Sequence, residues 1–355
     1  MTATMQALVF LGLGKAGVIE KPLPKAGPTD AVVRTTSALI CTSDVHTVRG
    51  GIPVPEGRGL GHESVGVIHE LGSAVTGFSV GQRVAVAATT PCFHCGPCQR
   101  GFSSQCQGML GAYKFTAQRD GNMAEYFLVN DAAANLAVIP DGLSDEKAVY
   151  ATDMLSTGFS GAENAQLRLG ESVAIFAQGP IGLSATIGCR LLGAGLIIAV
   201  EGRPERQELA RRFGADLIVD PGSGDVVGRI LELTGGIEVD AAIEALGSPV
   251  TFEAALRVTK PGGRISNIGY HGEVPEPLQI PLDAFGLGMS DKKILTSLCP
   301  GGSDRLDRIF RLIRSGRVDP TPMTTHQFGF DEVERAFSLM ESKRDGIIKP
   351  LIRFA

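Results

Sequence analysis

The feature that most constrains the fold of this chain is a regular alternation of apolar strands and amphipathic helices that begins near Gly170. Parallel strands need a crossover connection between them, usually a helix, so this alternation predicts a parallel, doubly wound α/β sheet. We expect strands at Glu171–Ala177, Leu196–Glu201, Ala241–Glu244 and Arg264–Ile268, and helices at Pro180–Leu192, Pro204–Phe213 and Pro249–Val258.

The first 150 residues have a different, β-rich texture. Apolar runs alternate with polar residues and are separated by Gly, Pro and Asp, which is typical of half-buried antiparallel strands. The clearest runs are Ala31–Arg34, Ser64–Glu70 and Arg83–Ala88. A single hydrophobic core stops growing at roughly 250–300 residues, so a chain of 355 residues is expected to form two domains. Past Pro300 we predict helices at Arg305–Ser315 and Phe330–Ser342 and a last strand at Ile347–Ile352.

Composition and charge exclude several classes of function. The formal net charge is −5 and no block of like charges stands out, which argues against a nucleic-acid surface. The first residues lack the basic start and the cleavage site of a signal peptide, and no run of about 18 apolar residues occurs. We therefore expect a cytoplasmic protein that does not span a membrane.

A glycine-containing turn joins the first predicted strand of the α/β region to its helix. Gly179 and Gly182 occupy the second and third positions of the dinucleotide-binding fingerprint, whereas Ala177 replaces its first glycine; Pro180 and Ile181 lie between. Such turns also occur without a nucleotide. The next strand ends at Glu201, followed by Gly202 and Arg203. A carboxylate at this place accepts the adenosine-ribose hydroxyls and favours NAD, although Arg203 can instead receive the 2′-phosphate of NADP.

Four of the seven cysteines crowd into one short segment, at Cys92, Cys95, Cys98 and Cys106. Two-residue gaps allow successive thiolates to turn toward one point, and four soft ligands in a tetrahedron are the pattern of a structural zinc ion. An iron–sulfur cluster uses similar spacings, and His94 is a possible substitute ligand.

A second constellation lies in L39-I-C-T-S-D-V-H and G59-L-G-H-E-S-V-G. Alone, Cys41 would be a buried core cysteine and His62 a turn histidine. Together they supply a thiolate and an imidazole about twenty residues apart, with Glu63 adjacent, and Asp44 is placed to hold the other ring nitrogen of His62.

In these segments, and from end to end, the sequence resembles the zinc-dependent medium-chain alcohol dehydrogenases, especially the bacterial secondary-alcohol enzymes. The motifs that carry the resemblance also include T152-D-M-L-S-T-G-F, N267-I-G-Y-H-G and L298-C-P-G-G. The resemblance implies a GroES-like β-rich catalytic domain at residues 1–155, with the cysteine lobe at 91–107, and a Rossmann domain at 156–297. Residues 298–355 would return to the catalytic domain.

The same resemblance implies the site. Cys41, His62 and Asp153 would bind the catalytic zinc, with Glu63 close by, and Ser43 and His46 would carry the hydroxyl proton to solvent. Thr157, Ile268, Gly269, Tyr270 and Lys349 would join the glycine turn in binding the cofactor, Lys349 near its phosphates or else as an ordinary exposed lysine. The substrate pocket would contain Ala88, Thr89, Tyr113, Tyr270, Leu298 and Cys299.

The expected reaction is hydride transfer between a small, secondary alcohol or its ketone and NAD, with NADP as the alternative. A polyol or aldehyde dehydrogenase, a zinc-independent reductase of the same superfamily and a non-catalytic NAD(H)-binding protein remain alternatives. Relatives are dimers or tetramers, so we expect a homodimer or homotetramer, with Met289–Pro300 pairing strands across a two-fold axis.

Overall fold

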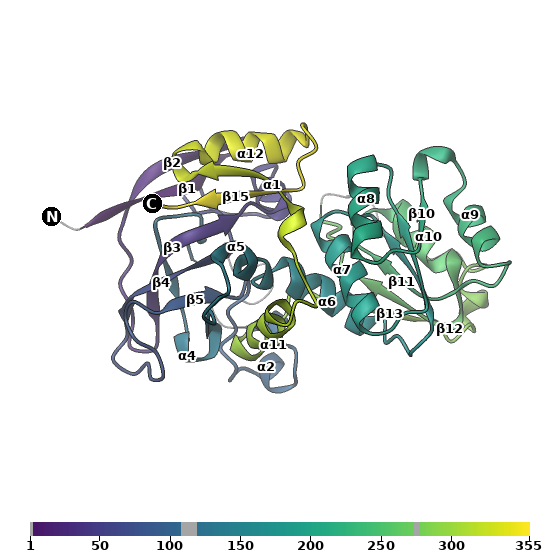
Figure 1. The fold of residues 1–355 in the computed structure, drawn as a ribbon, viewed down its shortest axis with the longest axis horizontal. Coiled ribbons are helices and arrows are strands. Elements are labelled where there is room, and N and C mark those ends of the chain that lie inside the picture. The colour runs from purple at the N-terminus through teal and green to yellow at the C-terminus, as the bar shows by residue number, and fades with distance from the viewer. Residues whose placement is uncertain (1–2, 108–118, 273–276) are drawn as a thin grey trace. The chain divides into compact units, whose positions relative to one another are not determined.

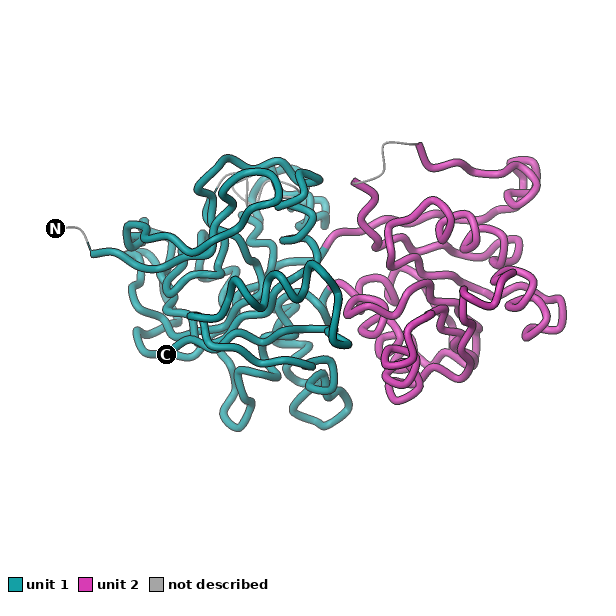
Figure 2. Tube along the Cα trace, turned by 90° about the horizontal axis from the view of Figure 1, so that it is seen from above, with its two compact units in different colours: residues 1–156, 299–355 teal, residues 157–298 magenta. Residues whose placement is uncertain are grey.

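The computed structural model describes residues 3–107, 119–272 and 277–355. The chain divides into two compact units, and Figure 2 shows that both chain ends belong to the first of them. Unit 1 comprises residues 1–156 and 299–355, and unit 2 comprises residues 157–298. Tyr113, an expected pocket residue, lies outside the described residues.

Unit 2 contains a six-stranded sheet in which every neighbouring pair of strands is parallel. Its strand order is β10-β9-β8-β11-β12-β13, which is the order 3-2-1-4-5-6 of a Rossmann sheet and confirms the predicted doubly wound fold. The strands are β8 (Ser172–Phe176), β9 (Leu196–Val200), β10 (Leu217–Val219), β11 (Val239–Glu244), β12 (Thr259–Asn267) and β13 (Lys293–Thr296).

Four helices connect these strands, and Figure 1 shows them together with the sheet. They are α7 (Pro180–Leu191), α8 (Pro204–Phe213), α9 (Val226–Leu233) and α10 (Pro249–Val258). Three of the four begin with a proline, which fits the first helical turn because its missing N–H has no partner there. The apolar faces of strands and helices form one core that includes Phe176, Ile198, Ile230, Phe252 and Ile265.

Unit 1 is built around a seven-stranded sheet with the path β14-β15-β3-β4-β5-β7, to which β6 adds by pairing with β3. A separate hairpin of β1 and β2 was not predicted. The strands are β1 (Thr4–Gly12), β2 (Lys15–Pro22), β3 (Ala31–Leu39), β4 (Glu63–Leu71), β5 (Arg83–Val86), β6 (Tyr126–Val129), β7 (Leu136–Val138), β14 (Thr324–Gly329) and β15 (Lys349–Arg353).

The last residues of the chain complete unit 1, since β15 pairs antiparallel with β3 and parallel with β14. Helix α12 packs against both β2 and β15, and Figure 1 shows it alongside these strands. Within the described residues, the helices of this unit are α1 (Thr42–Val48), α2 (Gly96–Gln99), α4 (Ala132–Asn135), α5 (Asp145–Ala148), α11 (Ser303–Arg314) and α12 (Val333–Ser342). Helix α6 (Met154–Asn164) begins in unit 1 and continues into unit 2.

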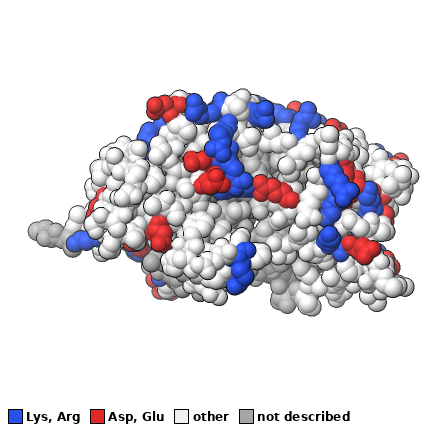
Figure 3. Space-filling view, turned by 90° about the horizontal axis from the view of Figure 1, so that it is seen from below, with Lys and Arg blue, Asp and Glu red and all other residues white. Residues whose placement is uncertain are grey.

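The apolar length of the helices and the distribution of surface charge both bear on function. Among the described residues, no helix is both long and apolar enough to cross a bilayer. On the face drawn in Figure 3, Lys and Arg side chains are interspersed with Asp and Glu.

Candidate metal centres and cofactor turn

Strand pairing in unit 1 brings together the thiolate and the imidazole that the sequence singled out. In the antiparallel pair of β3 and β4, Leu39 lies opposite Glu63, so the residues just beyond β3 meet those at the start of β4. Cys41 is the N-cap of α1 and lies two residues after the end of β3, while His62 immediately precedes β4. Asp153 comes from 112 residues further along and lies just before α6.

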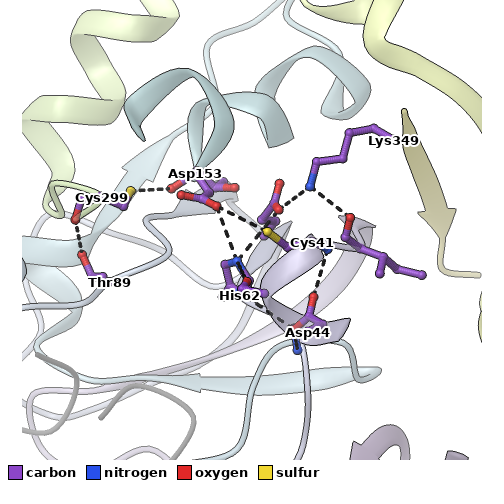
Figure 4. A network of polar contacts seen from close by, with 12 residues as sticks. Cys41, Asp44, His62, Thr89, Asp153, Cys299 and Lys349 are labelled. Atoms are coloured by element: carbon purple, nitrogen blue, oxygen red, sulfur yellow. Dashed lines mark hydrogen bonds and ion pairs between the residues drawn. The ribbon is translucent and has the colours of Figure 1, made fainter. Parts of the chain in front are cut away.

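One ligand atom from each of Cys41, His62, Glu63 and Asp153 lies within 4.8 Å of the others. Figure 4 shows Cys41, His62 and Asp153 pointing toward one another. The Asp153 Oδ2 atom is 3.4 Å from His62 Nε2 and 4.0 Å from Cys41 Sγ. In a tetrahedral zinc site, bond lengths of about 2.0–2.3 Å place neighbouring ligand atoms about 3.3–3.8 Å apart. The donor set and its spacing therefore fit one zinc ion.

The negative charges around His62 favour a cation there, although burial opposes one. All four residues are at most 9% exposed. Burial alone would lower the pKa of His62, but the negative charges of Asp44 and Cys41 raise it well above its usual value. A positive charge at Nε2 is thus stabilised, whether a proton or a metal ion supplies it, and we expect metal binding to weaken at low pH.

Asp44 orients the imidazole from behind. Its Oδ1 atom lies 3.6 Å from His62 Nδ1, and its two oxygens accept the backbone N–H groups of Cys41 and Gly61, each at 3.0 Å. Burial works against ionisation of this carboxyl, yet the charge of His62 and these hydrogen bonds lower its pKa. A carboxylate on the far nitrogen of a ligating histidine holds the ring in the orientation that the metal needs.

Glu63 is held beside the cluster by Lys349. The ammonium and carboxylate groups form an ion pair in which both residues are fully buried, and Lys349 Nζ also donates to Ile40 O at 3.0 Å. Glu63 Oε2 is buried and accepts no hydrogen bond within the described part of the chain, so it keeps a lone pair for a metal ion. Lys349 is thus buried, which excludes the alternative of an ordinary exposed lysine, while its expected place near the cofactor phosphates stays a prediction.

Ser43 and His46 lie on α1, three residues apart and so on the same side of the helix. Ser43 Oγ is 3.3 Å from His62 Nε2 and is therefore close to the metal cluster.

Of the expected pocket residues in unit 1, Thr89 Oγ1 donates to Cys299 O at 3.1 Å, and the backbone N–H of Ala88 donates to Thr152 O at 2.9 Å. Tyr270 and Leu298 belong to unit 2.

The two glycines of the L298-C-P-G-G motif are required by close packing at Gly301 and by the backbone conformation at Gly302. A Cβ atom on Gly301 would lie 2.3 Å from Thr89 O, and Gly302 has a φ of 106°, a conformation that favours glycine. The motif therefore allows the chain just before α11 to pack closely against the segment that leads into the cysteine lobe.

The four lobe cysteines surround one point. Cys106 Sγ is 3.5 Å from Cys92 Sγ and 3.9 Å from Cys95 Sγ, and Cys98 completes the set. Thiolates bound to one zinc ion at about 2.3 Å lie about 3.8 Å apart, whereas a disulfide needs about 2.05 Å. Backbone N–H groups of Cys98 and Gln107 lower the pKa of Cys95 to about 6, so a thiolate is available at neutral pH. The geometry excludes disulfides and suits a bound metal.

The cofactor turn of unit 2 follows β8, next to the point where the strand order reverses between β8 and β11. Gly179 is the N-cap of α7, and a Cβ placed there would meet only Arg206 Nη1, at 3.8 Å. A Cβ on Gly182 would lie 1.9 Å from Ala177 O, so that position must be glycine. Ala177 has a φ of 70°, the left-handed conformation that the missing first glycine would have adopted without strain. The space at Gly179 and the helix N-terminus can receive a pyrophosphate.

Glu201 follows β9 and is held by the backbone around it. Its oxygens accept the N–H groups of Gln178 at 2.8 Å and of Gly202 and Arg203 at 3.0 Å each. Arg206 lies beside Glu201 and was not predicted as a site residue. Its Nη1 atom lies 3.9 Å from Glu201 Oε2. In the sequence it is indicated only by its place, as a basic residue in the first turn of α8. The backbone N–H groups of Ile268 and Gly269, which follow β12, donate to Glu244 O.

Comparison with known proteins agrees with this geometry. A family described as "Alcohol dehydrogenase GroES-like domain" matches residues 27–141, and one described as "Zinc-binding dehydrogenase" matches residues 180–315. An alcohol dehydrogenase of Cupriavidus necator is 48% identical to this chain, over 99% of this chain and 100% of its own length. The chain belongs to the zinc-dependent medium-chain alcohol dehydrogenases.

A further relative and a solved structure add to this comparison. The NADP-dependent isopropanol dehydrogenase of Thermoanaerobacter brockii is 44% identical, over 99% of this chain and 100% of its own. Among solved structures, the alcohol dehydrogenase TADH from Thermus sp. ATN1 is similar with a TM-score of 0.89 and 31% identity, covering 99% of this chain and 100% of that one. The family and the fold class predicted from sequence are thereby confirmed.

Proposed function

We propose that this chain interconverts small secondary alcohols and their ketones, with zinc at the Cys41 cluster and a nicotinamide dinucleotide as hydride carrier. The observation that carries the proposal is the convergence of Cys41, His62, Glu63 and Asp153 on one point. Relatives named isopropanol dehydrogenases are 42–44% identical over nearly the whole chain, which supports a secondary alcohol as substrate.

Each residue of the cluster has a distinct role in this proposal. When bound, zinc acts as a Lewis acid that lowers the pKa of a hydroxyl group beside it. Cys41, His62 and Asp153 hold it. Asp44 keeps the imidazole oriented, and Lys349 offsets the charge of Glu63, so that the cluster does not carry a further uncompensated anion. Ser43 accepts the proton of the substrate hydroxyl and passes it toward His46 and solvent.

A direct test combines metal counting with an alcohol survey. We expect two zinc ions per chain and turnover of small secondary alcohols, followed by the absorbance of the reduced cofactor. Asp153→Ala should lose one zinc ion and most of its activity, whereas Asp141→Ala, at an exposed turn position, should keep both. An Asp153→Ala protein with two zinc ions and full turnover would refute the role of Asp153. Preference for polyols or aldehydes in the survey would redirect the substrate class, and a wild-type chain with one zinc ion would favour a zinc-independent reductase.

For the cofactor we propose NAD in preference to NADP. Glu201 places a carboxylate anchored by three backbone N–H groups at the end of β9, where it repels a 2′-phosphate. The isopropanol dehydrogenase relatives are named NADP-dependent, so kcat/KM with both cofactors decides the point. We expect wild type to favour NAD and Glu201→Ser to shift the preference toward NADP by roughly tenfold or more. A wild-type preference for NADP would refute the assignment.

We also propose that the chain associates through the open edge of the unit 2 sheet. Strand β13 ends the sheet and pairs only with β12 there. The segment before it exposes large apolar side chains, which mark association surfaces when they gather: Leu278, Ile280, Leu282, Leu287 and Met289. Light scattering should give a dimer or tetramer, and Met289→Glu together with Leu287→Asp should lower the mass. A monomeric wild-type chain would refute this proposal.

A further inference from the structure

Arg305 occupies an unusual place in unit 1. It lies in the first turn of α11, whose other buried residues are Leu306, Ile309, Phe310 and Ile313. Its side chain is on the same stripe as Ile309 and only 7% of the residue is exposed. Burying a guanidinium group is costly unless its N–H groups are hydrogen-bonded, so the contacts that it makes indicate what it does.

Two of its hydrogen bonds go to Ser156, in the first turn of α6. Arg305 Nη2 donates to Ser156 O at 2.8 Å, and Arg305 Nε donates to Ser156 Oγ at 3.2 Å. Ser156 Oγ in turn donates to Pro300 O at 3.2 Å. Arg305 therefore fixes Ser156, and through it joins the start of α6 to the segment that precedes α11.

A second connection lies on the other side of Asp153. Cys299 Sγ donates to Thr152 O at 3.8 Å, and Cys299 O accepts a hydrogen bond from Thr89 Oγ1. Figure 4 shows Cys299, Thr89 and Asp153 in this network. The backbone that carries Asp153 is thus held at residue 152 on one side and at residue 156 on the other.

Asp153 shares a crowded point with other potential metal ligands. Its carboxylate lies beside Cys41 Sγ and the buried carboxylate of Glu63, with His62 Nε2 at 3.4 Å, so a restraint on its backbone keeps the carboxylate in place among them. Metal ligands must be held to within about 0.5 Å of the productive geometry, and supporting residues commonly change metal affinity by about 10–100-fold.

We infer that Arg305 is a positioning residue for the metal centre: through Ser156 it holds the first turn of α6 and thereby sets where Asp153 presents its carboxylate. The inference rests on the proposed function, since it takes Asp153 as a zinc ligand. Arg305 touches neither substrate nor metal in this assignment, and it acts only through the backbone that it fixes.

The test compares four variants of the zinc-loaded protein. Arg305→Met removes the hydrogen bonds, Arg305→Lys keeps the charge without the two-point contact, and Ser156→Ala removes only the hydroxyl. Arg308→Met is the matched control, because Arg308 is on the same helix with a side chain that is 53% exposed. The readouts are the rate at which each zinc ion passes to a chromogenic chelator, the visible spectrum after cobalt substitution at the Cys41 cluster, and the melting temperature.

We expect Arg305→Met to release one zinc ion about tenfold faster or more, with a shifted cobalt spectrum, while release of the lobe zinc stays as in wild type. Arg305→Lys and Ser156→Ala should show smaller changes in the same direction, and Arg308→Met none. If Arg305→Met, Arg305→Lys and Ser156→Ala all release zinc at the wild-type rate and give the wild-type cobalt spectrum, the inference is overturned. Parallel loss of both zinc ions in step with the melting temperature would also overturn it, because that pattern indicates a general role in stability. A wild-type chain that binds zinc only in the lobe would refute the proposed function itself, and the inference with it.

Discussion

Lys349 and Glu63 form an ion pair that is fully buried, and removing one partner should have a large effect on the stability of unit 1. Lys349→Met keeps most of the side-chain volume but leaves the Glu63 carboxylate buried without its cation. Breaking a buried pair in this way costs about 3–5 kcal/mol in the free energy of unfolding. Adding Glu63→Gln removes the stranded charge, so the double variant should recover about 2 kcal/mol or more of that loss.

The pH dependence of this loss has a definite sign. Burial raises the pKa of Glu63 even though Lys349 opposes the shift, and without Lys349 the pKa should rise further. A carboxyl group with a raised folded-state pKa leaves stability intact below its unfolded value, about 4.3, and lowers it as the pH rises toward the folded-state pKa. The deficit of Lys349→Met relative to wild type should therefore grow as the pH rises above about 4.3.

Urea unfolding followed by far-ultraviolet circular dichroism is the suitable assay, since the chain has no tryptophan. Lys147→Met is the control: its ammonium lies 3.4 Å from Asp319 at the surface, and an exposed pair contributes at most about 1 kcal/mol. Zinc content must be measured in parallel, because lost metal also lowers stability. A Lys349→Met protein as stable as the control, or a double variant no better than the single one, would refute the reasoning.

Three further predictions concern other parts of the molecule. Cys98→Ser should bind one zinc ion fewer by elemental analysis, because four thiolates share one point; two retained ions would contradict the lobe assignment. Gly182→Ala should destabilise unit 2 by about 1–3 kcal/mol and weaken binding of reduced cofactor in fluorescence titrations, because the new Cβ at residue 182 would lie 1.9 Å from a carbonyl oxygen. The control Ala177→Gly should show neither effect. Burial opposes ionisation of Asp240, but the ion pair with Lys260 lowers its pKa. The stabilisation is present above about pH 3.9 and is lost as the pH falls, so urea midpoints of Asp240→Asn and wild type should converge in acid.

Local pattern in the sequence was sufficient for much of unit 2. Helices α8 and α10 have the predicted bounds, because proline at the first turn and the apolar periodicity are local signals. The short edge strand β10 was not predicted, since three residues carry too little pattern to distinguish a strand from a loop. Strand β13 lies within Met289–Pro300, the stretch in which strands were expected. In unit 1 the β1–β2 hairpin was not predicted although its strands are nine and eight residues long, and β3 extends five residues beyond the predicted run to Leu39.

The sequence by itself was sufficient to predict candidate residues for binding metal and cofactor, because thiolate spacing in the lobe and the glycines of the turn are short-range signals. Only the tertiary structure decided that Lys349 lies buried against Glu63, 286 residues away, and that Arg305 fixes Ser156 across 149 residues. Pairings at such separations depend on how β15 joins β3 and on how α11 brings Arg305 to the first turn of α6. Those are outcomes of burying apolar surface throughout unit 1, and no short stretch of sequence encodes them.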